Sequence, residues 1–178
     1  MPEILPFEHI APLFEEFEHT AWRLETRRGY AVDIGTARYE AFLRGEPLPY
    51  DPANVWHANV RRQVAQGKRF ERVRLVDEPL STGQRFLLTS GLGNVEAGED
   101  IRNLPRSTAQ RLGLPAVDFW LFDSRVLVRF HFDADDNTLG VELVEDPAQI
   151  LAACQARDAA WHHAVPTVEF ARRVPSAV

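Results

Sequence analysis

Residues 118–144 constrain the fold most, because their apolar and polar side chains alternate with the period of two that is typical of β-strands. Asp118–Phe122 is apolar on both faces, which indicates a strand buried near the centre of a sheet. Val126–Phe132 and Leu139–Val144 follow with apolar side chains on one face, and two aspartate-containing turns separate the three segments. We therefore predict an antiparallel meander over residues 118–144, with no helix within it.

Helices are expected on either side of this meander. Apolar residues at spacings of three and four predict a first helix over Phe7–Phe17. Asp51 and Pro52 have the residue types of an N-cap and a first helical position, which predicts a helix that begins at Pro52. Asp146 and Pro147 repeat this pattern ahead of a C-terminal helix that would pack back on the sheet.

The first clear strand is expected over Phe70–Val76. Its alternation puts Val73 on the face toward the core and Arg72 and Arg74 on the opposite face. Trp22–Thr26 also alternates, and it fits either a strand or an extended arm. Because helices come first and most strands later, the sequence predicts an α+β fold with N-terminal helices and an antiparallel sheet.

Length and composition favour one soluble domain. The chain has 178 residues, of which 45% are hydrophobic, and we expect a single α+β domain over 1–165 followed by a partly ordered tail over 166–178. The formal charge of −6 opposes attraction to nucleic acid or anionic membranes. A single cysteine, Cys154, excludes an intramolecular disulfide, and the N-terminus lacks a signal-peptide pattern, so we expect a cytoplasmic protein with no membrane contact.

No catalytic motif stands out. Gly91-Leu92-Gly93 lacks the rest of a phosphate-binding loop, and no serine lies in a nucleophile elbow. His131 and the aspartates after it lack the pattern of a calcium loop and are better explained as turn residues. We accordingly predict no catalytic residue, no metal site and no cofactor.

The best candidate for a ligand site is the segment 91–114, which we expect to be long, irregular and rich in charge. Glu96, Glu99, Arg102 and Arg106 could form a clamp for an anionic or zwitterionic ligand against Trp120. The alternative is structural: Glu99 would pair with Arg102, or Glu96 with Arg106, only to pin the loop. We favour the structural explanation.

Several stretches of the chain resemble a known family. They include Trp22-Arg23-Leu24-Glu25, the charged run Asn94–Arg102, Asp118–Asp123 and Arg157-Asp158-Ala159-Ala160-Trp161, and the resemblance covers nearly the whole chain. The family is an uncharacterised actinobacterial domain of unknown function, commonly encoded beside helix-turn-helix regulators in Streptomyces-like genomes. From the first stretch we add Arg23 and Glu25 to the candidate ligand-binding residues.

These observations lead to two functional hypotheses. The first is a non-enzymatic regulatory or interaction module, whose helix-turn-helix partner is implied only by the resemblance. The alternative is a small-molecule sensor or an enzyme, with a charged pocket for a phosphorylated or amino-acid-like ligand. Direct binding of nucleic acid is not expected under either hypothesis.

Overall fold

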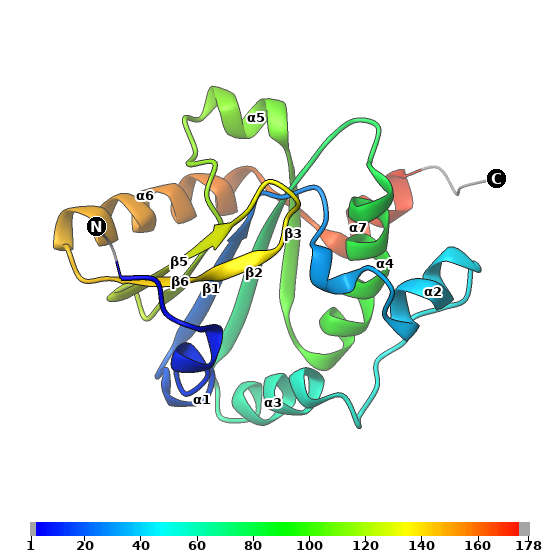
Figure 1. The fold of residues 1–178 in the computed structure, drawn as a ribbon, viewed down its shortest axis with the longest axis horizontal. Helices are drawn as coiled ribbons and strands as arrows, with labels where there is room; N and C mark the ends of the chain where they lie inside the picture. The colour runs from blue at the N-terminus through cyan, green and yellow to red at the C-terminus, as the bar shows by residue number, and fades with distance from the viewer. Residues whose placement is uncertain (1–2, 175–178) are drawn as a thin grey trace.

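The structure is a computed structural model that describes residues 3–174, and within them a mixed seven-stranded sheet has the order β6-β5-β4-β1-β2-β3-β7. The strands are β1 (Thr20–Glu25), β2 (Arg69–Val76), β3 (Asp100–Pro105), β4 (Phe119–Phe122), β5 (Val126–Phe132), β6 (Thr138–Val144) and β7 (Val165–Pro166). The helices are η1 (Phe7–Ile10), α1 (Leu13–Glu16), η2 (Ala31–Asp33), α2 (Ala37–Leu43), α3 (Val55–Val64), α4 (Thr82–Ala97), α5 (Arg106–Arg111), α6 (Pro147–His163) and α7 (Thr167–Arg173). Helices α4 and α7 cover one face of the sheet, and α6 covers the other (Figure 1).

The predicted α+β class and the meander are confirmed. Strands β4, β5 and β6 pair antiparallel in sequence order, and no part of 126–132 is helical. Asp123, Ser124 and Asp136 have positive φ, which explains why turn-forming residues separate these strands. The C-terminal helix α6 begins at Pro147 as expected, and the Asp146 side chain accepts a hydrogen bond from the Ala148 N–H at 2.9 Å.

The other half of the sheet is parallel, so the sheet as a whole is mixed rather than antiparallel. β1 pairs parallel with β2, β2 pairs parallel with β3, and β4 joins the two halves through its antiparallel pairing with β1. Helix α3 lies between β1 and β2 in the chain, and α4 lies between β2 and β3. These are the helical crossovers that parallel strands require.

The prediction of a long irregular segment over 91–114 is wrong, because the segment holds the end of α4, all of β3 and α5. The glycines of α4 are not helix breaks but places of close contact. A Cβ on Gly83 would lie 2.4 Å from the carbonyl oxygen of Arg28, and one on Gly91 would lie 2.5 Å from Arg74 Nη1. Ser81 and Gln84 form the capping box that begins this helix.

Two predicted helix boundaries also need correction. The single helix expected over Phe7–Phe17 is divided into η1 and α1, with Pro12 at the start of the second piece. The N-cap of α3 is Asn54 rather than Asp51, since the Asn54 side chain accepts a hydrogen bond from the His57 N–H. Asp51 instead accepts from the Ala53 N–H, so Pro52 lies in a turn that precedes the helix.

Both faces of the central strands are buried. As predicted, Val73 faces a core that includes Trp22 and Leu24 and is covered by α6. The opposite face is covered as well, by one hydrophobic cluster around Phe14, Phe70 and Trp120 and by another whose members are Tyr30, Leu48, Phe86 and Leu87. Arg72 and Arg74 therefore lie inside the protein, with only 7% and 5% of their surface exposed.

The segment expected as a partly ordered tail from residue 166 contains part of β7 and helix α7. β7 pairs with β3 at the edge of the sheet. The Asn103 side chain donates a 2.8 Å hydrogen bond to the Thr167 hydroxyl, and both residues are buried. Residues 175–178 of the expected tail lie outside the described residues.

Candidate functional site: a buried cluster of arginines and carboxylates

Four charged residues of the two central strands point to one face of the sheet. Arg23 and Glu25 alternate along β1, and Arg72 and Arg74 alternate along β2, so each pair has the same orientation. The strand register puts Arg23 beside Arg72 and Glu25 beside Arg74. These four charged side chains lie on the face of the sheet that also carries the two hydrophobic clusters. We call these four residues, together with the carboxylates that contact them, the arginine site.

Glu25 is the centre of the arginine site. Its carboxylate accepts a 2.7 Å hydrogen bond from Arg72 Nη1 and a second hydrogen bond from Arg74 Nε. Arg72 Nη2 also donates to Glu99 Oε1 at 2.8 Å, and Trp56 Nε1 donates to the other oxygen of Glu99 at 3.2 Å. Two carboxylates thus hold the Arg72 guanidinium in place from two sides.

Arg23 is held much less tightly. Its Nε lies 3.3 Å from Glu25, and its Nη2 lies 3.4 Å from Asp118. The Asp118 carboxylate already accepts from the N–H and hydroxyl of Thr26, at 2.8 and 2.7 Å, and from the Tyr30 hydroxyl at 2.6 Å. Asp118 is therefore largely engaged by neutral donors, and Arg23 retains hydrogen-bonding capacity for another acceptor.

Two guanidinium nitrogens of this site lack a hydrogen-bond partner among residues 3–174. They are Arg23 Nε and Arg72 Nε, and both atoms are buried. A buried donor with no acceptor costs roughly 1–3 kcal/mol, more when it is charged. The aromatic faces of Trp120 and Phe130, 5.5 and 4.6 Å from the Arg23 guanidinium carbon, offset part of this cost.

The electrostatics of the site keep the Glu25 carboxylate ionised. Burial by itself would raise the pKa of Glu25, but the charges of Arg72, Arg74 and Arg23 outweigh burial and hold that pKa well below its usual range. Burial, together with the charges of Glu25 and Asp118, raises the pKa of Tyr30 well above its ordinary value. Tyr30 therefore stays a neutral hydrogen-bond donor at physiological pH.

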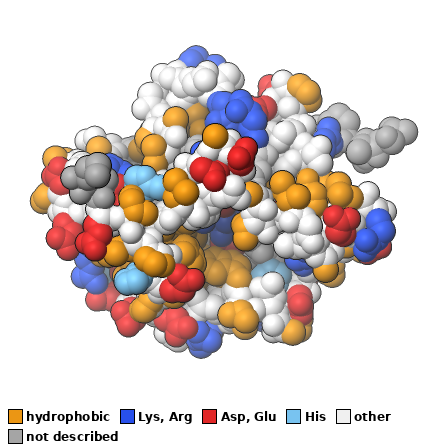
Figure 2. All heavy atoms as spheres, viewed as in Figure 1, with side chains coloured by type: hydrophobic (Ala, Val, Ile, Leu, Met, Phe, Trp, Pro, Cys, Tyr) orange, Lys and Arg blue, Asp and Glu red, His pale blue; other side chains and the backbone are white. Residues whose placement is uncertain are grey.

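The arginine site opens into a pocket of about 720 Å³. Arg23, Arg72 and Arg74 lie at its charged end. Its aromatic lining consists of Phe7, Tyr30, Phe86, Phe130 and Phe132. Arg23 and Arg72 also line an adjoining hollow of about 250 Å³. Figure 2 shows a hollow near the centre of the viewed face, with basic and hydrophobic side chains at its depth.

One acidic residue of the pocket has an unusual environment. Asp33, in η2, is half-buried, and burial followed by the negative charge of Glu25 raises its pKa. The charges of Arg74 and Arg23 act in the opposite direction but do not cancel this effect. Titratable groups with such environments cluster at functional sites in general.

The structure brings together four of the seven residues predicted to bind a ligand. Arg23, Glu25 and Glu99 belong to the arginine site, and Trp120 lies against it, 5.5 Å from the guanidinium carbon of Arg72. Trp120 is fully buried and is at the same time part of the core.

The remaining three lie elsewhere. Arg102 lies on the other face of the sheet, where it pairs with Asp100 and stacks on Trp161. Arg106 pairs with Asp77, and Glu96 is exposed on α4. Both predicted pairings, Glu99 with Arg102 and Glu96 with Arg106, are therefore wrong. They assumed a loop, whereas β3 directs Arg102 away from Glu99.

Sequence reasoning missed Arg72, Arg74, Asp118 and Tyr30 as site residues. The alternation in Phe70–Val76 had identified the face that carries both arginines, but that face was expected to lie opposite the core. A usable signal was present: β1 and β2 both alternate charged with large apolar residues, as paired strands buried on two faces can do when their charges neutralise each other.

Neither a metal site nor a membrane-spanning helix is evident in the described part of the chain. Within residues 3–174, no group of three or more His, Cys, Asp and Glu side chains is arranged to hold a metal ion. No helix among these residues is long and apolar enough to cross a membrane.

Comparison with known families gives a direct match. The family described as "Domain of unknown function (DUF6879)" matches residues 8–172. The chain belongs to this family. Its membership agrees with the resemblance to an uncharacterised family, although the match does not test an actinobacterial origin or an association with regulators. No curated protein matches the chain.

Two solved structures share the fold of this DUF6879 protein. NucT from Helicobacter pylori has a TM-score of 0.54 and 8% sequence identity, and the alignment covers 89% of each chain. Nuc from Salmonella typhimurium, a phospholipase D family member, has a TM-score of 0.51 and 9% identity, over 93% of this chain and 98% of Nuc. At these identities the likeness shows the fold alone.

The comparison nevertheless corrects the leading functional hypothesis. A non-enzymatic regulatory module was expected because no catalytic motif was visible, but the fold is shared with a member of an enzyme family. The alternative hypothesis, a sensor or enzyme with a charged pocket, agrees better with this finding. The sequence alone did not reveal this likeness, because the likeness lies in the fold and not in short motifs.

Proposed function

We propose that this DUF6879 protein binds, in the pocket above Arg23 and Arg72, a small phosphorylated molecule that carries an aromatic or apolar group. The observation that carries the proposal is the state of Arg23, a nearly buried guanidinium whose contacts with Glu25 and Asp118 are 3.3 and 3.4 Å long and whose Nε has no hydrogen-bond partner within residues 3–174. A phosphate in the pocket would accept a strong, charge-assisted hydrogen bond from the exposed part of this guanidinium.

The pocket's shape and lining match such a ligand. Its volume of about 720 Å³ lies within the usual range of about 300–1,000 Å³ for small-molecule sites. Aromatic side chains such as Phe86 and Phe132 offer surfaces for a ring, while Ser90 and Asn94 add polar groups near the charged end. Such a pocket can bind a ligand that has one anionic group and one apolar group.

A phosphate is favoured over an amino-acid-like ligand by the shared fold. A phospholipase acts on a phosphate ester, and Nuc is a phospholipase D family member. Arg23 and Arg72 are neighbours in the register of β1 and β2 and line the same pocket, which suits a group with several acceptor oxygens better than a single carboxylate. The same pocket can serve an enzyme or a sensor, and a turnover assay distinguishes them.

The test uses phenyl phosphate, with phenol and benzoate as matched probes. We expect phenyl phosphate to raise the melting temperature of the wild type, with smaller shifts for the other two at equal concentration. Arg23→Gln should weaken binding of phenyl phosphate tenfold or more, since a hydrogen bond to a charged group is worth about 1.5–3 kcal/mol. Arg69→Gln is the control, because Arg69 is exposed and lies outside the pocket.

A second variant guards against misfolding of Arg23→Gln. Thr138 is exposed at the rim of the pocket, so Thr138→Glu adds a negative charge without removing a core residue. It should also weaken binding of phenyl phosphate. Equal affinity of wild type and a folded Arg23→Gln, or an equal response to phenol, would contradict the proposal. Release of phosphate from phenyl phosphate would identify an enzyme, and binding without release a sensor.

The finer implications of the resemblance stay predictions. An actinobacterial origin and a helix-turn-helix partner rest on the quoted stretches alone. A ligand-dependent contact with such a partner would fit the sensor form of this proposal, and co-purification with and without phenyl phosphate would test it.

A further inference from the structure

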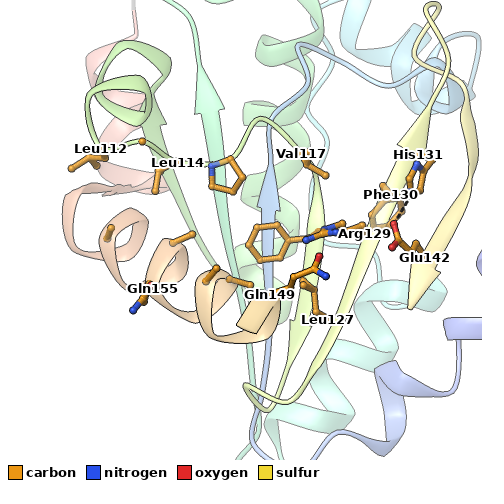
Figure 3. Close-up of a pocket in the computed structure, with 17 residues that line it drawn as sticks. Leu112, Leu114, Val117, Leu127, Arg129, Phe130, His131, Glu142, Gln149 and Gln155 are labelled. Carbon is orange, nitrogen blue, oxygen red and sulfur yellow. Dashed lines mark hydrogen bonds and ion pairs between the residues drawn. The ribbon is translucent and has the colours of Figure 1, made fainter. Parts of the chain in front are cut away.

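A second pocket lies on the other face of the sheet from the arginine site. It has a volume of about 740 Å³ and is enclosed by α6, the segment 112–117 and strands β4 and β5 (Figure 3). The side chains that form most of its wall are apolar: Leu112, Leu114, Pro115, Val117, Phe119 and Leu127. We call it the α6 pocket.

The α6 pocket exists because α6 presents small side chains to it. Four alanines of α6 line it, namely Ala152, Ala153, Ala156 and Ala159. Larger residues of the same helix, Ile150 and Trp161, pack against the core instead. The helix is therefore anchored by its large side chains, while its alanines leave an apolar space beside the sheet.

One cation reaches into this apolar space. Figure 3 shows the Arg129 side chain of β5 extending into the pocket, near Gln149 of α6. Among residues 3–174, the Arg129 side chain makes no hydrogen bond and no ion pair within 4 Å, although its charge helps to lower the pKa of Asp146 at the start of α6. The nearby carboxylate of Glu142 hydrogen-bonds with His131 at 3.0 Å instead. Arg129 thus offers a half-buried guanidinium with its donors unused.

We propose that the α6 pocket binds an amphipathic carboxylate, with the carboxylate on Arg129 and the apolar body against the alanines of α6. A guanidinium matches a carboxylate with two parallel hydrogen bonds. A single head group of one negative charge is required, because Arg129 is the only lining residue in the described chain that carries a permanent positive charge, and Glu142 at the same end would repel a dianion. The site is independent of the phosphate proposed for the arginine site.

The test measures binding of dodecanoate, below its micellar concentration, by calorimetry on the full chain. Dodecanol and dodecyltrimethylammonium have the same apolar body with a neutral and a positive head group. We expect Arg129→Gln to weaken dodecanoate binding at least tenfold while changing dodecanol binding little. Arg125→Gln is the matched control, because Arg125 lies in the same hairpin, is exposed and does not line the pocket.

A second pair of variants locates the apolar body. Ala156→Phe fills the pocket and should reduce binding of both dodecanoate and dodecanol, whereas Leu151→Phe adds bulk to an exposed position of α6 outside it. Thr138→Glu, at the arginine site, should leave dodecanoate binding unchanged. The proposal is overturned if wild type does not bind dodecanoate, if Arg129→Gln binds it equally well, or if Ala156→Phe has no effect.

Discussion

Among the residues that the structure describes, Glu25 is the carboxylate that forms ion pairs with the largest number of arginines. It contacts Arg23, Arg72 and Arg74, and it is 4% exposed. Removing one partner of a buried ionic network is costly because the remaining charges stay desolvated and unpaired. The stability of the arginine site should therefore depend on this carboxylate.

Glu25→Gln should destabilise the protein by about 3–5 kcal/mol, the cost of breaking a buried ion pair. Chemical denaturation at pH 7 measures the loss. Glu46→Gln is the control, because Glu46 forms an exposed pair with Arg44 and its loss should leave the melting temperature nearly unchanged. Equal effects of the two substitutions would show that the network contributes no more than a surface pair.

The lowered pKa of Glu25 also gives this effect a pH dependence. A carboxyl with a lowered pKa in the folded state stabilises the fold above its ordinary pKa, and this contribution is lost as the pH falls toward the folded-state pKa. The difference in stability between wild type and Glu25→Gln should therefore be full at pH 7 and shrink below about pH 4.

Asp33→Asn should change the stability of the fold in the opposite direction, by raising it at pH 7. Burial and the charge of Glu25 raise the pKa of Asp33, so the fold favours the protonated form and loses stability as the pH rises through that pKa. We expect Asp33→Asn to melt at a higher temperature than wild type at pH 7 and at nearly the same temperature below pH 4. Asp135→Asn, at an exposed position, is the control and should not change the melting temperature in a pH-dependent way. If Asp33→Asn raises the melting temperature equally at all pH values, the raised pKa of Asp33 is not the reason.

At the scale of elements, helices α4 and α6 position the two pockets. α4 lies across β2 and brings Leu87 to the arginine site, where its carbonyl accepts from Arg74 Nη1 at 2.5 Å. α6 lies on the other face and leaves the alanine-lined space. The start of each helix is defined by side chains, a capping box at Ser81 and an aspartate cap at Asp146.

Asp146→Ala should lower stability by about 1 kcal/mol, the usual value for loss of an N-cap. For a chain of this size that is a fall in melting temperature of about 2–4 °C. Asp158→Ala, an exposed substitution in the same helix, should have a smaller effect. A melting temperature unchanged by Asp146→Ala would mean that its hydrogen bond to the Ala148 N–H is not needed to begin α6.

Gly83→Ala should destabilise the protein although alanine favours helices. An added Cβ would lie 2.4 Å from the Arg28 carbonyl oxygen and 2.9 Å from Gly29 Cα, and backbone atoms cannot move aside as a side chain can. We expect a loss of about 1–3 kcal/mol, as for other overpacked sites. Thr82→Ala, at the neighbouring exposed position, is the control; a stabilised Gly83→Ala variant would show that this contact is loose.

At the scale of the whole molecule, residues 165–173 complete the edge of the sheet. β7 pairs with β3, and α7 packs on β3 and α4 near the buried pair Asn103 and Thr167. This edge supports the helix that covers the arginine site. The sequence expectation of a domain over 1–165 can be tested at this place.

Ending the chain after Ala164 should destabilise the fold by several kcal/mol, because it exposes the β3 edge and leaves the Asn103 amide without its partner. A chain that ends after Val174 is the control, since it loses only residues 175–178, which lie outside the described part. Thermal unfolding of both chains gives the comparison. A chain of residues 1–164 that melts like the control would support a domain that ends near residue 165.

The sequence by itself determined the elements whose signals are local. Periodic apolar residues fixed the meander over 118–144 and the strand at Phe70–Val76, and Asp146 with Pro147 fixed the start of α6, because period and capping act over a few neighbouring residues. Asp51 was wrongly predicted as an N-cap, because a turn in which the Asp51 side chain accepts from the Ala53 N–H has the same residue types as a helix cap.

Only the tertiary structure decided which charges meet. Arg23 and Arg72 are far apart in the chain, and they become neighbours through the parallel register of β1 and β2, which no local pattern encodes. The segment from residue 91 was expected to be irregular, whereas the structure continues α4 through Gly91 and brings Gly83 and Gly91 close to Arg28 and Arg74. The arginine site could therefore be predicted only in part from the sequence: its residue types follow a local pattern, but their partners depend on strand pairing and on which helix covers the face.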